Sequence, residues 1–221
     1  MIRIWIYCIC FLSAFINMCG YLHYSYSLSH YTGNIIDIAL RFFDDDKSEA
    51  IGVIGSLIFF FVCGGIVGGF INRNKEFAFE SRYGNTQLIF GVVLVFLYFL
   101  FPVKWFYLFF CALLLGIENS LIRSYNGLGF RTTHVTGTLS DLGTYISYYL
   151  QGNRQAGWKI MFEISLVVSF FLGSITGIFL YVHLRGHIFL LAGILFILSG
   201  LIYRVVCKKY FTALSSQRET E

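Results

Sequence analysis

Long apolar runs separated by short polar segments dominate the chain. A membrane-spanning helix needs about 20 mostly apolar residues, and six stretches are predicted to meet this need: residues 4–27, 50–71, 87–102, 103–122, 161–183 and 187–206. Each is predicted to be helical, because a backbone in lipid must satisfy its own polar groups. The alternating segments of about ten residues that are typical of a membrane β-barrel are absent. The pattern therefore predicts an all-α fold, a polytopic membrane helix bundle with the lipid bilayer as a partner.

The amino-acid composition agrees with this pattern. Of the 221 residues, 57% are hydrophobic and 13% are charged, whereas a soluble domain carries about 25% charged residues. One proline against 22 glycines suits membrane helices whose backbones approach one another closely. The basic residues form no stripe with interleaved aromatic residues, so nucleic acid is not an expected partner.

The placement of the basic residues predicts the orientation. Cytoplasmic loops carry an excess of Lys and Arg. With the N-terminus in the cytoplasm, all but four of the 16 Lys and Arg residues lie on the inner side, the exceptions being Arg41, Lys47, Lys104 and Arg185. We expect a multi-pass protein of the cell membrane with both termini in the cytoplasm.

Two polar segments, residues 28–49 and 123–160, share one motif. Each contains a hydroxyl residue, His, any residue, Thr, Gly, three residues and Asp, running from Ser29 to Asp37 and from Thr133 to Asp141. Downstream, residues 56–71 align without gaps to residues 165–180. Upstream, Gly20 and His23 fall opposite Gly116 and Asn119. This self-similarity predicts an internal repeat.

The repeat implies two units of opposite orientation. Each unit holds one helix, one Thr-Gly segment and two further helices, which gives residues 1–102 and 103–207, followed by a polar cytoplasmic tail at 208–221. Three crossings is an odd number, so the second unit must enter the membrane from the other side. We expect two inverted three-helix repeats, each with a broken or re-entrant Thr-Gly half-helix.

The same residues carry a resemblance to a known family. Gly20 and Thr32-Gly33-Asn34 in the first unit, with residues 116–120 and 131–143 in the second, resemble the YoaK family of bacterial integral membrane proteins, a domain of unknown function. The resemblance implies a helical protein of the bacterial cytoplasmic membrane and implies no particular activity. The chain departs from the family at His23, where an acidic residue is usual, and at Glu118, where Gln is usual.

The Thr-Gly segments are the first candidates for function. A Thr-Gly start gives a short helix free N–H groups and lets a ligand approach closely. A half-helix that ends near the bilayer midplane can form an ion or solute site there. The predicted path residues are His30, Thr32, Gly33, Asn34, Asp37, His134, Thr136, Gly137, Thr138 and Asp141. The alternative is that these side chains only cap and pin two broken helices.

Polar residues within the predicted spans add Glu118 and Asn119 to this path. A charge at the centre of a membrane helix costs roughly 2.5–3.5 kcal/mol, so it should face the protein interior and have a partner. Arg123, five residues on, is a candidate partner for Glu118. The alternative is a side chain at the helix end that reaches the membrane surface.

Two glycine pairs predict close helix packing. Gly64 and Gly68 align with Gly173 and Gly177, and both pairs have the spacing that lets membrane helices approach. The simplest arrangement packs the two pairs against each other, and the alternative is a hinge.

These patterns together favour a small-solute or ion transporter with a central site between the two half-helices. A non-transporting scaffold or assembly partner is the second hypothesis, and a membrane-embedded enzyme is the third. The sequence lacks the common hydrolase, metalloprotease and phosphate-loop motifs and any zinc-like spacing of Cys and His, so no catalytic residue, metal or cofactor is expected. Homo-oligomer formation is left open.

Overall fold

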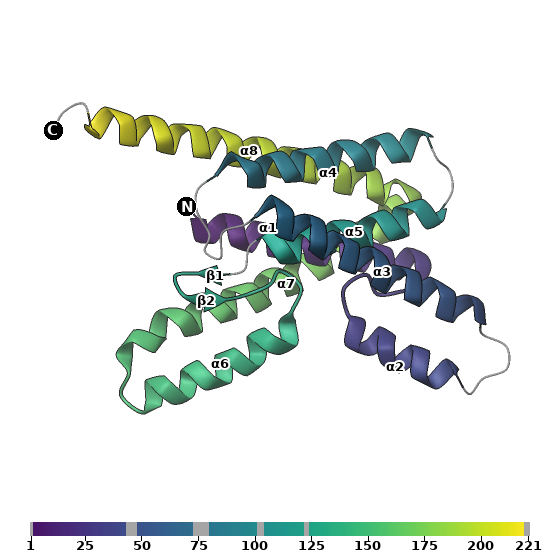
Figure 1. Cartoon of the computed structure of the whole chain (residues 1–221), viewed down its shortest axis with the longest axis horizontal. Helices are drawn as coiled ribbons and strands as arrows, with labels where there is room; N and C mark the ends of the chain where they lie inside the picture. Colours follow the sequence, from purple (N-terminus) through teal and green to yellow (C-terminus); the bar gives the residue numbers. More distant parts are fainter. Residues whose placement is uncertain (1, 43–47, 73–79, 101–103, 122–123, 219–221) are drawn as a thin grey trace.

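The protein is built almost wholly from α-helices (Figure 1). The computed structural model describes residues 2–42, 48–72, 80–100, 104–121 and 124–218. Its α-helices are α1 (Ile2–Tyr24), α2 (Tyr31–Arg41), α3 (Ser48–Ile71), α4 (Ser81–Leu100), α5 (Lys104–Leu121), α6 (Val135–Leu150), α7 (Gly157–Leu184) and α8 (Ile188–Arg218). A two-residue hairpin pairs β1 (Ser124–Tyr125) with β2 (Leu128–Gly129), and the 3-10 turns η1 (Arg154–Ala156) and η2 (Arg185–His187) precede α7 and α8.

Several helices are long and apolar enough to cross a membrane. Among the described residues there are four such stretches: Ile2–Tyr24, Glu49–Ile71, Ser81–Leu100 and Arg154–Tyr210, the last of which contains both α7 and α8. Helix α5 is apolar but shorter. The chain therefore has the helices of a membrane protein, as the apolar runs predict.

Two helix boundaries differ clearly from the prediction. Helix α4 begins at Ser81 instead of residue 87, because the polar residues Thr86 and Gln87 are buried inside the bundle. Helix α8 continues to Arg218 instead of ending at 206. No glycine or proline follows Gly200 to stop it. Most of the predicted polar tail therefore extends α8.

The main packing is between pairs of helices that are distant in sequence. Helix α3 lies along α5 and α7 lies along α1. A β-carbon on Gly64 would collide with the Leu113 carbonyl oxygen, and one on Gly173 would collide with the Phe11 carbonyl oxygen. The expectation that the two glycine pairs pack against each other is wrong. Each pair instead packs against the first long helix of the other half of the chain, since only glycine leaves room for a backbone there.

Helices α4 and α8 form a third pair that the sequence analysis did not single out. Gly84 faces Gly200 and Gly91 faces Gly193, and in each facing pair a β-carbon on one glycine would press on the other's carbonyl oxygen. The two helices are therefore antiparallel and almost in backbone contact. The signal in the sequence is a seven-residue glycine spacing that occurs in both helices.

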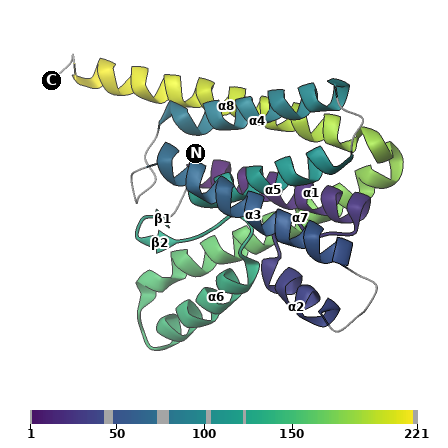
Figure 2. The same ribbon diagram turned by 45° about the vertical axis from the view of Figure 1, so that its right-hand side comes forward.

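The two short helices lie together on one flank of the bundle. In both views α2 and α6 sit below the other helices, and they diverge from neighbouring ends (Figures 1 and 2). Helix α2 has 11 residues and α6 has 16, or about 16 and 24 Å of helix, less than the roughly 30 Å hydrocarbon core. Helix α2 packs on α3, and α6 packs on α7.

Candidate functional site

Helices α2 and α6 begin with the same local structure. Their N-cap residues, His30 and His134, have backbone angles of φ −96°, ψ 63° and φ −95°, ψ 60°. In each helix the N–H four residues later, that of Asn34 or Thr138, donates to the histidine carbonyl oxygen at 3.1 Å. The side chains of Asn34 and Thr138 are both buried. The shared Thr-Gly motif therefore folds twice into one structure.

The two glycines of the motif differ in their surroundings. A β-carbon on Gly137 would collide with the imidazole of His134, so glycine is what lets that ring lie over the start of α6. Gly33 has open space around it, and His30 turns instead toward α1.

Asn17 of α1 fixes the chain that leads into α2. Its Oδ1 accepts the Leu28 N–H at 3.0 Å, and its Nδ2 then donates to His30 Nε2 at 3.2 Å. The His30 ring also lies 5.9 Å, between centroids, from that of Phe170. Asn17 is therefore an anchor for the first half-helix.

Asn119 of α5 has the same role for α6. Its Oδ1 accepts the Thr133 N–H at 3.3 Å and the Thr132 hydroxyl at 3.2 Å, and its Nδ2 donates to Thr133 Oγ1 at 2.7 Å. The sequence alignment placed Asn119 opposite His23. In the structure, Asn119 of α5 is instead equivalent to Asn17 of α1, because each bonds to the chain that enters a short helix.

This difference is a shift of six residues between α1 and α5. The structural pairing of Asn17 with Asn119 also brings Phe11 and Leu113 into equivalent positions, and these are the residues that meet Gly173 and Gly64. His23 lies elsewhere, with its Nδ1 3.2 Å from the Tyr181 hydroxyl. Matching Gly20 with Gly116 set the wrong register.

Glu118 lies between the two anchors. Its carboxyl is buried, and its Oε2 accepts a hydrogen bond of 2.6 Å from the Ser13 hydroxyl of α1. Its Oε1 has no hydrogen-bond partner among the described residues. The suggested partner, Arg123, lies outside the described residues. The carboxyl points into the bundle, which is not the arrangement of a side chain that reaches the membrane surface.

These contacts form one polar row through the apolar bundle. Ser13 and Asn17 are one helical turn apart on α1, and Glu118 and Asn119 are adjacent on α5. The row, defined here as His30, Asn17, Ser13, Glu118, Asn119 and Thr133, links the starts of the two half-helices. Ser13 is the central residue of α1, so the row crosses the middle of the bundle.

The two aspartates of the motif do not join this row. Asp37 pairs with Arg41 at 2.9 Å, one turn along α2. Asp141 lines a pocket of about 230 Å³ at the start of α6, together with Arg131, His134, Gly137 and Thr138. Within the described residues no hydrogen bond joins His30 to Asp37 or His134 to Asp141, and Thr32 and Thr136 are exposed.

A comparison with protein families gives one match. Residues 5–201 match a family described as a protein of unknown function (DUF1275). The chain belongs to this family. No curated protein and no solved structure matches it significantly. Membership is consistent with the YoaK-like resemblance, and it leaves the activity of this DUF1275 protein to be argued from its site.

Three residues of the row were missed as site candidates. Thr133 opens the second copy of the shared motif, which was its signal. Asn17 is a polar residue in an apolar run, which was its signal, although nothing local shows that it meets the second polar segment. Ser13 has no such signal, because a serine in a membrane helix usually bonds to its own backbone. Only the pairing across α1 and α5 identifies it.

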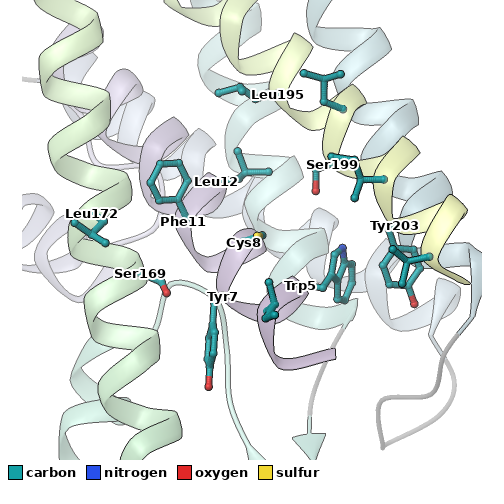
Figure 3. A pocket seen from close by; sticks show the side chains of 14 residues that line it. Trp5, Tyr7, Cys8, Phe11, Leu12, Ser169, Leu172, Leu195, Ser199 and Tyr203 are labelled. Carbon is teal, nitrogen blue, oxygen red and sulfur yellow. The ribbon is translucent and has the colours of Figure 1, made fainter. Parts of the chain in front are cut away.

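A lateral groove of this DUF1275 protein lies between α1, α7 and α8 (Figure 3). It has a volume of about 610 Å³, and its walls are apolar residues such as Phe11, Leu172 and Leu195. The hydroxyls of its two serines are engaged: Ser169 donates to the Ser165 carbonyl, and Ser199 donates to Gln87 Oε1 at 2.6 Å. The described residues that line the groove include no His, Asp or Glu.

Proposed function

We propose that this protein is a small-solute or ion permease of the cell membrane. The observation that carries the proposal is the polar row, in which a buried carboxyl and two amides connect the starts of two short helices. Polar and ionisable groups inside a membrane protein are costly and characteristically mark ion and solute pathways. Glu118 favours a cation or a proton-coupled solute as cargo. Its Oε1, which has no hydrogen-bond partner among the described residues, can bind a cation or take up a proton. No catalytic residue, metal or cofactor is assigned.

The proposal includes an inverted architecture of two three-helix units, residues 1–102 and 103–207. The matching starts of α2 and α6 support it, and so do the equivalent roles of Asn17 and Asn119. The α4–α8 contact gives further support. Gly193 and Gly200 stand 109 residues after Gly84 and Gly91, and the antiparallel contact pairs Gly84 with Gly200 and Gly91 with Gly193. The same offset relates residues 56–71 to 165–180. Six crossing helices would place both termini on the same side of the membrane, and the excess of Lys and Arg favours the cytoplasm for that side.

A non-transporting scaffold is the second candidate. The observation in its favour is that Ser13, Asn17, Glu118 and Asn119 are all buried and that each is hydrogen-bonded within the protein. Such a network can serve only to hold two broken helices in place. It requires no passage of solute and no movement of the half-helices.

Reconstituted transport separates the two candidates. Purified protein in liposomes is tested with a pH-sensitive dye under a proton gradient, with Na⁺ and K⁺ gradients, and with labelled small metabolites. Glu118→Gln keeps the size of the side chain and should lower flux about tenfold or more, as removal of one essential proton-transfer group does. Glu163→Gln is the matched control, because Glu163 is equally buried but lies on α7 outside the row.

The outcomes are distinct. Wild-type flux above that of empty liposomes, lost in Glu118→Gln and kept in Glu163→Gln, supports the permease. Asp37→Asn and Asp141→Asn test the motif aspartates in the same assay, and unchanged flux in both removes them from the path. A correctly folded wild-type protein with no flux for any cargo in the panel leaves the scaffold as the better description.

A further inference from the structure

The flank that carries α2 and α6 exposes polar side chains among apolar ones at a depth where lipid tails would lie. The Tyr31 hydroxyl, at the start of α2, donates to the Leu57 carbonyl near the midpoint of α3 at 3.2 Å. Just before α6, the Thr132 carbonyl accepts from Cys10 near the midpoint of α1 at 3.2 Å. Both half-helices therefore begin near the middle of the bundle and run outward on one side (Figures 1 and 2).

Charged residues follow within the hydrocarbon depth. Asp37 and Asp141 each lie six residues past the start of their helix. At a rise of about 1.5 Å per residue they are no more than about 9 Å from the middle, whereas half of the hydrocarbon core is about 15 Å thick. Asp141 is exposed, and Asp37 keeps 40% of its side-chain surface accessible. Lipid tails are a poor environment for such carboxylates.

Helix α6 also exposes a stripe of small polar residues. Ser140, Gly143, Thr144 and Ser147 are all exposed and recur at spacings of three and four residues. No atom lies within 4 Å of a β-carbon built on Gly143. In the α3–α5, α1–α7 and α4–α8 pairs such small residues are covered by another backbone. This flank has the composition of a helix contact and no helix upon it within the described residues.

We propose that a second copy of this chain covers the α2–α6 flank and completes the permeation path. The argument for a second copy is self-complementarity. Small residues let a helix backbone approach its own equivalent closely across a two-fold axis, as Gly84 and Gly200 do for two helices within the bundle. Asp37 and Arg41 likewise place both signs of charge next to each other, which a symmetric contact can pair crosswise.

The membrane fixes the geometry of this dimer. Two copies inserted in the same direction are related by a two-fold axis along the membrane normal, so that α2 faces α2 and α6 faces α6. The four half-helix starts then surround the axis. The polar row of each copy opens onto that axis, and the path lies between subunits. This inference rests on the proposed function for its path and on the exposed flank for its contact.

Disulfide cross-linking tests the contact. In a Cys8→Ser background, which removes the native cysteine that is exposed, Gly143→Cys on α6 is oxidised in native membranes. Ile89→Cys is the matched control, because Ile89 is 57% exposed and belongs to α4, a helix on the opposite side of the bundle from α2 and α6 (Figure 1). We expect a disulfide-linked dimer from Gly143→Cys and monomer from Ile89→Cys. Monomer from both, a dimer from Ile89→Cys alone, or a cross-link to a different protein overturns the proposal.

The mass of the purified protein gives a second measurement. In nanodiscs or mild detergent the wild type should have twice the chain mass of 25.3 kDa. Gly143→Trp should raise the dissociation constant of the dimer about tenfold or more, as overpacking of a close contact does. A monomeric wild type overturns the dimer. A stable dimer without flux supports the proposed interface and counts only against the permease. Flux from a monomeric protein supports the permease and counts only against the interface.

Discussion

The hydroxyl of Ser13 donates a 2.6 Å hydrogen bond to Oε2 of Glu118, and this bond joins the centre of α1 to the last turn of α5. The two residues are 105 positions apart. The bond links the anchor of the first half-helix with that of the second, since Asn17 and Asn119 stand beside its two ends.

Ser13→Ala should destabilise the protein measurably. The change leaves Oε2 of a buried carboxyl without its donor, at a cost of about 1–3 kcal/mol. Ser165→Ala is the control, because Ser165 is half-buried and its hydroxyl donates only to the Met161 carbonyl one turn back. Thermal unfolding in detergent should show a lower Tm for Ser13→Ala and no change for Ser165→Ala. An equal decrease in Tm for the two variants would mean that the hydrogen bond to Glu118 stabilises the protein no more than the bond within α7.

Asn17→Ala and Asn119→Ala should loosen different half-helices. Each asparagine fixes one chain entry, that of Leu28 or that of Thr133. Hydrogen exchange measured by mass spectrometry should become faster in residues 28–36 for Asn17→Ala and in residues 132–140 for Asn119→Ala. The other segment of each variant is the internal control. Faster exchange in both segments of either variant would show that the two anchors act as one unit.

Gly91→Ala should weaken the α4–α8 contact. A β-carbon there would collide with the Gly193 carbonyl oxygen, which belongs to a backbone and cannot turn aside. Overpacking of this kind costs about 1–3 kcal/mol. Gly52→Ala in α3 is the matched control, because open space surrounds Gly52 and alanine favours a helix by up to about 1 kcal/mol. Chemical or thermal unfolding should separate the two variants, and a Gly91→Ala protein as stable as the wild type would contradict the close contact.

The sequence predicted the helical class and the paired Thr-Gly starts because both are local. Apolar runs of sufficient length must be helical in lipid, and one motif folds alike at His30 and His134. The partners of the helices could not be predicted in the same way. Gly64 and Gly173 signal a close approach without naming the opposing helix, and that choice depends on the whole bundle.

The register of the site shows the same limit. Gly20 and Gly116 align by type, yet Gly20 lies against Leu28 while Gly116 lies against the Phe61 carbonyl. Their identity was therefore a poor guide to position. Asn17 and Asn119 align by role, because each must reach the chain that enters a half-helix. Such a role is visible only when the loops before α2 and α6 have been placed in space.

Reporter fusions should place the connection around Gly186 on the extracytoplasmic side of the membrane and the C-terminus in the cytoplasm. The connection holds Arg185 and an exposed, open Gly186, so an insertion there disturbs no packing. Lys208 and Lys209 follow the apolar part of α8 and favour the cytoplasmic side for that end. Alkaline phosphatase, active only outside, should be active at 186 and inactive after residue 221, and green fluorescent protein should give the opposite result. If the fusions at residue 186 and after residue 221 gave the opposite results, the protein would have the opposite orientation in the membrane. The same result at both sites would mean that α8 does not cross the membrane, and then two inverted three-helix units could not be the architecture of this protein.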